Sequence, residues 1–134
     1  MKRNYIKILP ALVLAATISL VFSCKDPEPP KAKITVIDQN DELVDEAMVV
    51  IKAADSDDTS TRIYLASGIK EIADTSYTED GVVRKEFLYE SIYRVEVTKR
   101  GDNNTPTRRG IGVLILENDK TYEETITITP QTSF

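Results

Sequence analysis

The side chains that most often carry out catalysis are scarce in this chain of 134 residues, which has no histidine and a single cysteine, Cys24. Without histidine there is no imidazole base, no His-containing catalytic triad and no histidine ligand for a metal. One cysteine excludes an intrachain disulfide, a Cys-x-x-Cys redox pair and a multi-cysteine zinc site. Phosphate-binding Gly-rich loops and Gly-x-Ser-x-Gly motifs are also missing. We therefore expect a non-catalytic protein with no cofactor and no metal.

The first part of the chain has the composition of a secretory signal. Three basic residues, Lys2, Arg3 and Lys7, precede an uncharged run of 15 residues at 8–22. This length fits the apolar region of a signal peptide and is shorter than the ~20 residues that a membrane-spanning helix needs. The sequence therefore predicts export from the cytoplasm.

The run ends at Val21-Phe22-Ser23-Cys24, which resembles the lipobox of bacterial lipoproteins, although Phe22 stands where that pattern usually has a small residue. The resemblance implies cleavage between Ser23 and Cys24 and acylation of Cys24. It predicts a signal peptide over residues 1–23 and an outer-membrane lipoprotein, facing the surface or the periplasm, with the membrane as one partner. The alternative is a buried free thiol or ordinary cleavage beside a spare cysteine.

The remaining chain is acidic and begins with a tether. Residues 24–134 hold all 22 acidic residues and 14 of the 17 basic ones, a net charge of −8, which disfavours nucleic acid as a partner. Residues 24–31 contain the lipidated cysteine and three prolines, which predict an extended spacer. At ~3.1 Å per residue it would hold the domain roughly 20 Å from the membrane.

From residue 32 onward, short β-rich runs alternate with turn residues, and no window has a sustained apolar stripe of helical period. The clearest strands are expected at 32–38, 48–53, 93–100, 111–116 and 125–129, with weaker ones at 63–66, 71–78 and 82–88. The run 111–116, apolar on both faces except at Gly112, suits a central strand. We predict an all-β fold: a single antiparallel β-sandwich of about seven strands over residues 32–130, followed by a tail at 131–134.

Three motifs resemble the carboxypeptidase-regulatory-like (transthyretin-like) domains. They are Asp38-x-Asn40-Asp41-x-x-Val44-x-x-Ala47-x-Val49, the turn Thr78-Glu79-Asp80-Gly81-Val82-Val83, and Ser91-Ile92-Tyr93-Arg94-Val95-Glu96-Val97. The resemblance implies a transthyretin-like or Ig-like sandwich, and the enzymes of similar fold use histidines that are absent here. Asp41 replaces the family's turn glycine, which is acceptable because Asp can adopt a left-handed conformation. Lys85 falls on the face expected to be buried, so we expect an edge strand with the lysine ammonium in water.

The segment 101–110 is the longest stretch expected to be an unstructured loop. Its polar residues Asn103, Asn104, Arg108 and Arg109 form a candidate partner-binding site, because loops at the ends of sandwiches often carry recognition. The alternative is a long solvated hairpin.

Two acidic clusters and four tyrosines are weaker candidates. The clusters could supply oxygen ligands for calcium, or form solvated turns. They are Asp38, Asp41, Glu42, Asp45 and Glu46 in the first, and Asp55, Asp57 and Asp58 in the second. The tyrosines could form a sugar-binding platform, or lie half-buried in the core. They are Tyr64, Tyr77, Tyr89 and Tyr122.

These observations favour a lipid-anchored binding or adhesion module that contacts a surface protein or glycan. A structural part that pairs through a sheet edge is the alternative, and an enzyme is a distant third. An exposed aromatic patch would favour sugar binding, whereas a bare apolar edge strand would favour assembly.

Overall fold

The computed structural model describes residues 26–54, 62–68, 70–103 and 105–131. Cys24 and the signal sequence lie outside these residues. The described part of the chain is built from strands and turns, and it contains no helix that could span a membrane. The strands are β1 (Lys31–Ile37), β2 (Met48–Ala53), β3 (Ile63–Tyr64), β4 (Lys70–Glu71), β5 (Ala73–Tyr77), β6 (Val82–Glu86), β7 (Ser91–Arg100), β8 (Pro106–Leu116), β9 (Thr121–Thr127) and β10 (Thr129–Pro130).

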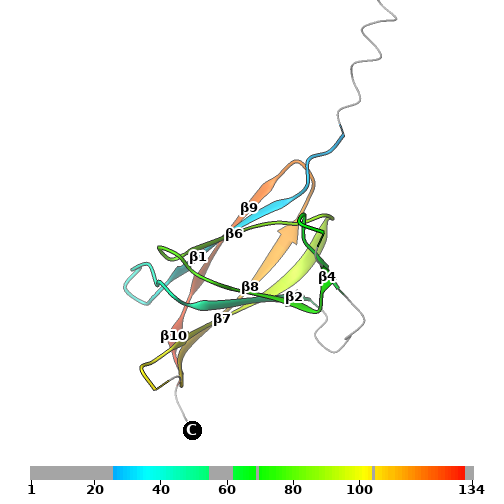
Figure 1. The fold of residues 1–134 in the computed structure, drawn as a ribbon. Coiled ribbons are helices and arrows are strands. Elements are labelled where there is room, and N and C mark those ends of the chain that lie inside the picture. The colour runs from blue at the N-terminus through cyan, green and yellow to red at the C-terminus, as the bar shows by residue number, and fades with distance from the viewer. Residues whose placement is uncertain (1–25, 55–61, 69, 104, 132–134) are drawn as a thin grey trace, which may run out of the picture.

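Two sheets pack face to face (Figure 1). One has three strands in the order β6-β1-β9, and the other has five in the order β10-β8-β7-β2-β5, while β3 and β4 pair separately. The predicted all-β sandwich is confirmed, with eight strands in its two layers rather than about seven.

The prediction of a wholly antiparallel sandwich is wrong at one pair. β1 and β9 are parallel, from Lys31 opposite Thr121 to Ile37 opposite Thr127. The pairs in the five-stranded sheet are antiparallel, as is β1 with β6. The alternation of apolar and polar residues sets which face of a strand is buried, but it does not encode the direction of the neighbouring strand.

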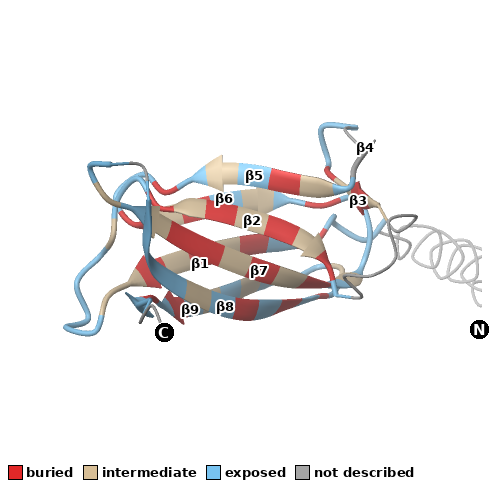
Figure 2. Ribbon diagram, turned by 90° about the horizontal axis from the view of Figure 1, so that it is seen from below, coloured by how far each residue is buried: buried red, intermediate tan, exposed pale blue. Residues whose placement is uncertain are grey.

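The core lies between the two layers, where one face of each strand is apolar (Figure 2). Ile34 and Val36 of β1 are fully buried against Ile51 of β2 and Val95 of β7. Each such aliphatic side chain contributes roughly 1.5–3 kcal/mol through burial. In β7 the alternate residues Tyr93, Val95 and Val97 are buried, as expected for a strand with one face on the core.

The strand boundaries follow the sequence patterns closely for β1, β2 and β7, whereas β8 begins five residues before the predicted 111–116, and β9 begins four residues before the predicted 125–129 and ends two residues before it. β2 has the predicted bounds, β1 begins one residue early, and β7 begins two residues early. Residues 71–78 divide between β4 and β5, because Ile72 separates the two strands. The two motif turns have the backbone that their residues favour: Asp41 has φ of 61°, and Asp80-Gly81 has φ of 52° and 74°. The last pair matches a type I′ turn, which needs positive φ at both positions.

Candidate functional site

The edge of β8 is an exposed apolar feature of the sandwich. Within the described chain, β10 covers β8 only at Arg108 and Arg109, and no strand pairs with Gly110–Leu116 on the side opposite β7. The prediction that 111–116 is a central strand is therefore wrong, because only β7 pairs with this run. Its inner face, including Leu114, is buried, whereas the side chains on its outer face lie in solvent.

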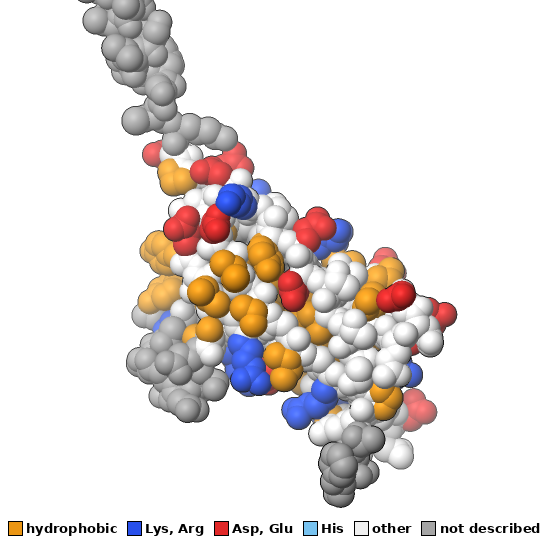
Figure 3. All heavy atoms as spheres, turned by 180° about the vertical axis from the view of Figure 1, so that it is seen from behind, with side chains coloured by type: hydrophobic (Ala, Val, Ile, Leu, Met, Phe, Trp, Pro, Cys, Tyr) orange, Lys and Arg blue, Asp and Glu red, His pale blue; other side chains and the backbone are white. Residues whose placement is uncertain are grey.

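The outer side chains of β8 continue into an aliphatic stripe, which we define as Ile92, Ile111, Val113 and Ile115. Their exposed fractions are 52%, 64%, 46% and 49%. Ile92 of β7 lies directly opposite Ile115 in the ladder, so the four side chains share one face of the sheet. Figure 3 shows hydrophobic side chains gathered on this face, with Lys and Arg side chains beside them. A contiguous exposed apolar patch at a free strand edge is typical of a protein interaction site.

Two glycines allow β9 to cross close beneath this edge. A Cβ atom on Gly110 would lie 2.7 Å from Ile126 Cγ2 and 2.8 Å from the Thr127 carbonyl oxygen. A Cβ atom on Gly112 would lie 2.8 Å from Ile126 Cδ1. The inner face of β8 thus packs against β9, and its outer face and free edge remain accessible to a binding partner.

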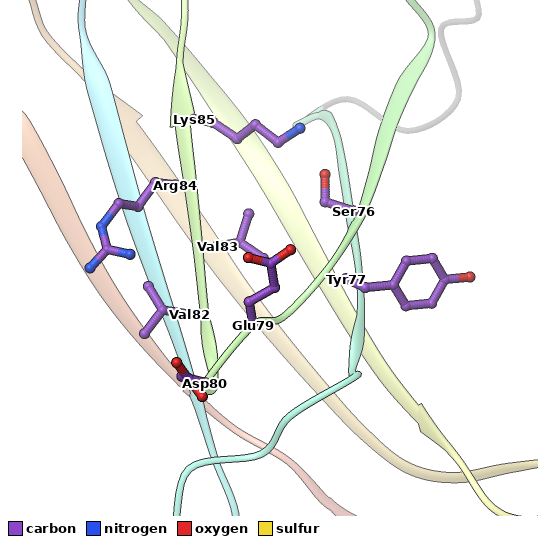
Figure 4. Close-up of a pocket in the computed structure, with 8 residues that line it drawn as sticks. All are labelled: Ser76, Tyr77, Glu79, Asp80, Val82, Val83, Arg84 and Lys85. Atoms are coloured by element: carbon purple, nitrogen blue, oxygen red, sulfur yellow. The ribbon is translucent and has the colours of Figure 1, made fainter.

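A groove of about 720 Å³ lies between the edge strands β5 and β6, where the two sheets separate after the Asp80-Gly81 turn. Val83 lies at its centre, and polar side chains of both strands line it (Figure 4). Figure 4 shows Lys85 extending from β6 toward β5, while Tyr77 and Arg84 point away from the groove.

Lys85 closes one end of this groove by pairing with Asp74 of β5. Its Nζ atom lies 2.9 Å from Oδ2 and donates to Oδ1 at 3.2 Å, and Ser76 Oγ is 3.4 Å from Oδ2. The side chains of Lys85 and Asp74 are only 22% and 9% exposed. β6 is an edge strand, as expected, and the Lys85 ammonium meets a carboxylate from the opposite sheet, a partner that the sequence did not predict. Inward-pointing charges of this kind protect an edge against pairing with another chain.

The predicted loop at 101–110 is mostly strand. β8 begins at Pro106, so Arg108 and Arg109 lie in the five-stranded sheet. The connection itself is a short turn in which the Gly101 amide donates to the Thr105 carbonyl at 3.0 Å. Asn103 is exposed in this turn, and Asn104 lies outside the described residues. The turn is at the end of the sandwich away from residue 26 (Figure 1).

The basic residues near this turn contact acidic partners. Arg108 Nη1 lies 3.5 Å from Asp38 Oδ2. Lys99 Nζ donates to the Asp45 carbonyl at 2.8 Å and is 3.8 Å from Glu46 Oε2. These pairs neutralise much of the positive patch that the sequence predicts, which weakens the turn as a site for an acidic partner.

The first acidic cluster forms a turn. Asp38 Oδ1 accepts from the amides of Asn40 at 2.8 Å and Glu42 at 3.2 Å. The Asn40 amide above all, together with that of Glu42 and the charge of Arg108, lowers the pKa of Asp38 below its usual value. Within the described residues no group of three acidic side chains converges to hold a metal ion, and the second cluster, Asp55, Asp57 and Asp58, lies outside them.

The four candidate tyrosines do not form one platform. Tyr64 and Tyr89 meet edge to face with ring centroids 5.4 Å apart, whereas Tyr77 is exposed on β5 and Tyr122 packs against the core. Tyr77 and Tyr89 are 63% and 56% exposed, but only Tyr89 is in ring contact with another of the four tyrosines.

The predicted tether is shorter than the sequence suggests. The Glu28 amide donates to Asp119 Oδ1 at 2.8 Å, and the Asp119 amide donates to the Glu28 carbonyl at 3.0 Å. Pro30 is buried, and its carbonyl accepts from Phe87 at 2.9 Å. The folded body thus begins at about residue 28.

Neither a scan against protein-family models nor a search of curated proteins found a match for this chain. The interpretation of its role therefore depends on the geometry of the described residues. Sequence analysis placed Ile111, Val113 and Ile115 of the aliphatic stripe in a strand, but it left Ile92 outside the strand predicted at 93–100 and missed the exposure of all four side chains. The local sequence carries no signal for this exposure, because it depends on the neighbouring strand β10 being only two residues long.

Proposed function

We propose that this chain is a lipid-anchored, non-catalytic component of the bacterial cell envelope that assembles with protein through the free edge of β8. The observation that supports the proposal is the uncharged segment Ile111–Leu116, which has unpaired backbone groups at its edge and exposed aliphatic side chains on its outer face. Strand addition to such an edge gains backbone hydrogen bonds and apolar contact together.

The contrast with the other sheet edges supports the choice of β8. The edges of β5 and β6 face the groove and are guarded by the Asp74–Lys85 pair. β9 presents alternating exposed residues such as Thr121, Glu123 and Thr125 along its outer face. Among the edges of the described sheets, only β8 has both backbone groups without a neighbouring strand and a run of exposed aliphatic side chains.

A photo-cross-linking residue tests this assembly in intact cells. Placed at Ile111, it should give covalent protein products, whereas the same residue at Thr75, exposed on the outer face of β5, should give few or none. Equal labelling from both positions, or no product from Ile111, would refute assembly through β8.

The anchor needs a separate test because it depends on the lipobox resemblance. Cys24→Ser should abolish incorporation of labelled palmitate and move the chain out of the detergent phase. A variant that is still labelled and still partitions with lipid would refute Cys24 as the anchor.

A binding module that uses the turn after β7 is the second candidate. It is favoured by the position of this turn at the end of the sandwich away from the start of the described chain (Figure 1), and by the exposure of Asn103 in the turn. Replacing residues 102–104 with Gly and Ser should then abolish binding to a surface protein or glycan without loss of folding.

A further inference from the structure

The free edge of β8 begins beside a cation. Thr129 of β10 pairs with Arg109, so the edge is free only beyond that residue. The first free position on the outer face is the one beside Ile111. Because Arg109 precedes Ile111 by two residues in the strand, both side chains lie on the outer face. One end of a strand added to the free edge would therefore lie close to the Arg109 guanidinium.

The outer face beside this edge has more cations than carboxylates, although the chain as a whole has a net charge of −5. Lys and Arg side chains border the hydrophobic patch on this face (Figure 3). Arg94 of β7 and Lys52 of β2 are neighbours in the ladder. Glu96 is the only carboxylate that the strands of this sheet place on the outer face, since Asp74 points inward. Lys52, Arg94 and Arg109 thus share a single carboxylate.

That carboxylate is already engaged, which leaves positive charge at the end of the ladder. Glu96 Oε2 lies 3.0 Å from Lys52 Nζ, and its Oε1 lies 3.3 Å from Arg94 Nε. The buried Arg94 Nε atom still lacks a well-aligned hydrogen-bond acceptor. Arg109 is exposed and forms no ion pair within the described part of the chain. It borders an open hollow of about 120 Å³ that Arg94, Glu96 and Ile111 also line, so its side chain is free to meet an incoming carboxylate.

We infer that the protein segment that pairs with β8 is an acidic strand: it carries Asp or Glu beside Ile111 and aliphatic residues beside Val113 and Ile115. This inference rests on the proposed assembly through β8. A side chain beside Ile111 is the diagonal neighbour of Arg109, a distance that long side chains span. The pairs in this sheet are antiparallel, so the acid is expected at the C-terminal end of the added strand.

The other end of the ladder is acidic. Glu117 follows Leu116 and pairs with Lys120. Glu90 Oε1 accepts from the Asn118 amide at 2.9 Å. An acid at this end of an added strand would meet two carboxylates, so the contrast between the ends favours one direction and one register. The same carboxylates would repel an anionic lipid surface laid against the aliphatic stripe, which favours a protein strand over a bilayer as the occupant.

Photo-cross-linking in intact cells tests the acidic partner. A photo-reactive residue at Val113, in the middle of the free ladder, should give a covalent product with protein. Arg109→Glu should lower the yield of that product about three- to tenfold, because it replaces an attraction by a repulsion, whereas Arg109→Lys should retain most of it. Arg84→Glu makes the same change of charge at an exposed position of the edge strand β6 and should leave the yield unchanged.

The outcomes separate this inference from the wider proposal. Mass spectrometry should map the cross-link to a segment that alternates aliphatic residues and has Asp or Glu on their C-terminal side. An unchanged yield with Arg109→Glu, or a linked segment without that acid, would overturn the inference and leave assembly through β8 standing. Absence of any protein product from Val113 would overturn both. A product with lipid in place of protein would identify a bilayer as the occupant and would also overturn both.

A defined peptide measures the charge preference independently of the natural partner and of the fold of the Arg109 variants. Antiparallel to β8, the probe Thr-Val-Thr-Val-Ser-Glu-Ser places valines beside Ile115 and Val113 and the glutamate beside Ile111. Added to the full chain in detergent, it should shift the NMR amide signals of the free ladder at about two- to fivefold lower concentration than the same peptide with Gln in place of Glu. Added salt should reduce that difference, and a Lys peptide should bind more weakly than either. Equal binding of the three peptides would overturn the inference.

Discussion

Lys85 of β6 and Asp74 of β5 join the two sheets at their open edge, with Nζ 2.9 Å from Oδ2. Both side chains point inward from edge strands of different layers, so the pair replaces apolar core contacts at this end of the sandwich. A charge pair in such a place contributes little net stability, because the cost of desolvating both groups offsets much of their attraction. Removing one partner alone should therefore lower the free energy of unfolding, whereas removing both should change it little.

Lys85→Met should lower the free energy of unfolding by about 2–3 kcal/mol, because it leaves the Asp74 carboxylate buried without its cation. The double variant Asp74→Leu with Lys85→Met should recover stability to within about 1 kcal/mol of the parent. Urea unfolding followed by circular dichroism measures both. A double variant as unstable as the single one would contradict this account. The double variant should also aggregate more readily, because its edge strands no longer carry inward-pointing charges.

Asp38 should make part of the stability depend on pH. Its folded-state pKa lies below the 3.8 of an unperturbed aspartate, so the unfolded chain takes up the proton first as the pH falls. The stabilising contribution of the Asp38 carboxylate is complete above the unfolded-state pKa of 3.8. It is lost as the pH falls through the lower folded-state pKa. Asp38→Asn keeps an acceptor for the Asn40 amide but does not titrate. The urea midpoint of the parent should thus fall more steeply below pH 4 than that of the variant, and parallel profiles would refute the assignment.

Thr78 connects the β5–β6 turn to the segment before β2. Its hydroxyl donates to the Val44 carbonyl at 2.8 Å and accepts from the Ala47 amide at 2.9 Å, and the residue is 2% exposed. Thr78→Val keeps the shape but leaves both backbone groups unpaired, which should cost about 2–3 kcal/mol. Thr78→Ser retains the hydroxyl and should cost less. Equal losses in the two variants, measured by thermal unfolding, would show that packing and not hydrogen bonding matters here.

Gly110 should not tolerate a side chain. An added Cβ would meet both a side-chain methyl of Ile126 and the backbone of Thr127, so strand β9 would have to move. Gly110→Ala should therefore destabilise the domain by about 1–3 kcal/mol. Gly68→Ala is a useful comparison, since space is open there and only its φ of 82° opposes the change. A Gly110→Ala protein as stable as the parent would refute the close crossing of β8 and β9.

The sequence by itself determined the class of fold and most strand positions. Period-two alternation in segments such as 48–53 specifies a half-buried strand because successive side chains point to opposite faces. Asp-Gly at 80–81 specifies a tight turn because few other residues adopt positive φ at low cost. Both signals are local, so they can be recognised without knowledge of the neighbours.

The tertiary structure alone decided which strands are neighbours, and with that the candidate site. Whether Ile111, Val113 and Ile115 are buried depends on whether another strand covers β8, and β10 ends after two residues at Pro130. Arg108 lies in a strand and not in the predicted loop, because β8 begins at Pro106. Lys85 pairs with Asp74 because the two sheets meet at β5 and β6. Pairing, direction and coverage arise from contacts between segments far apart in the chain, and a local pattern of side chains does not encode them.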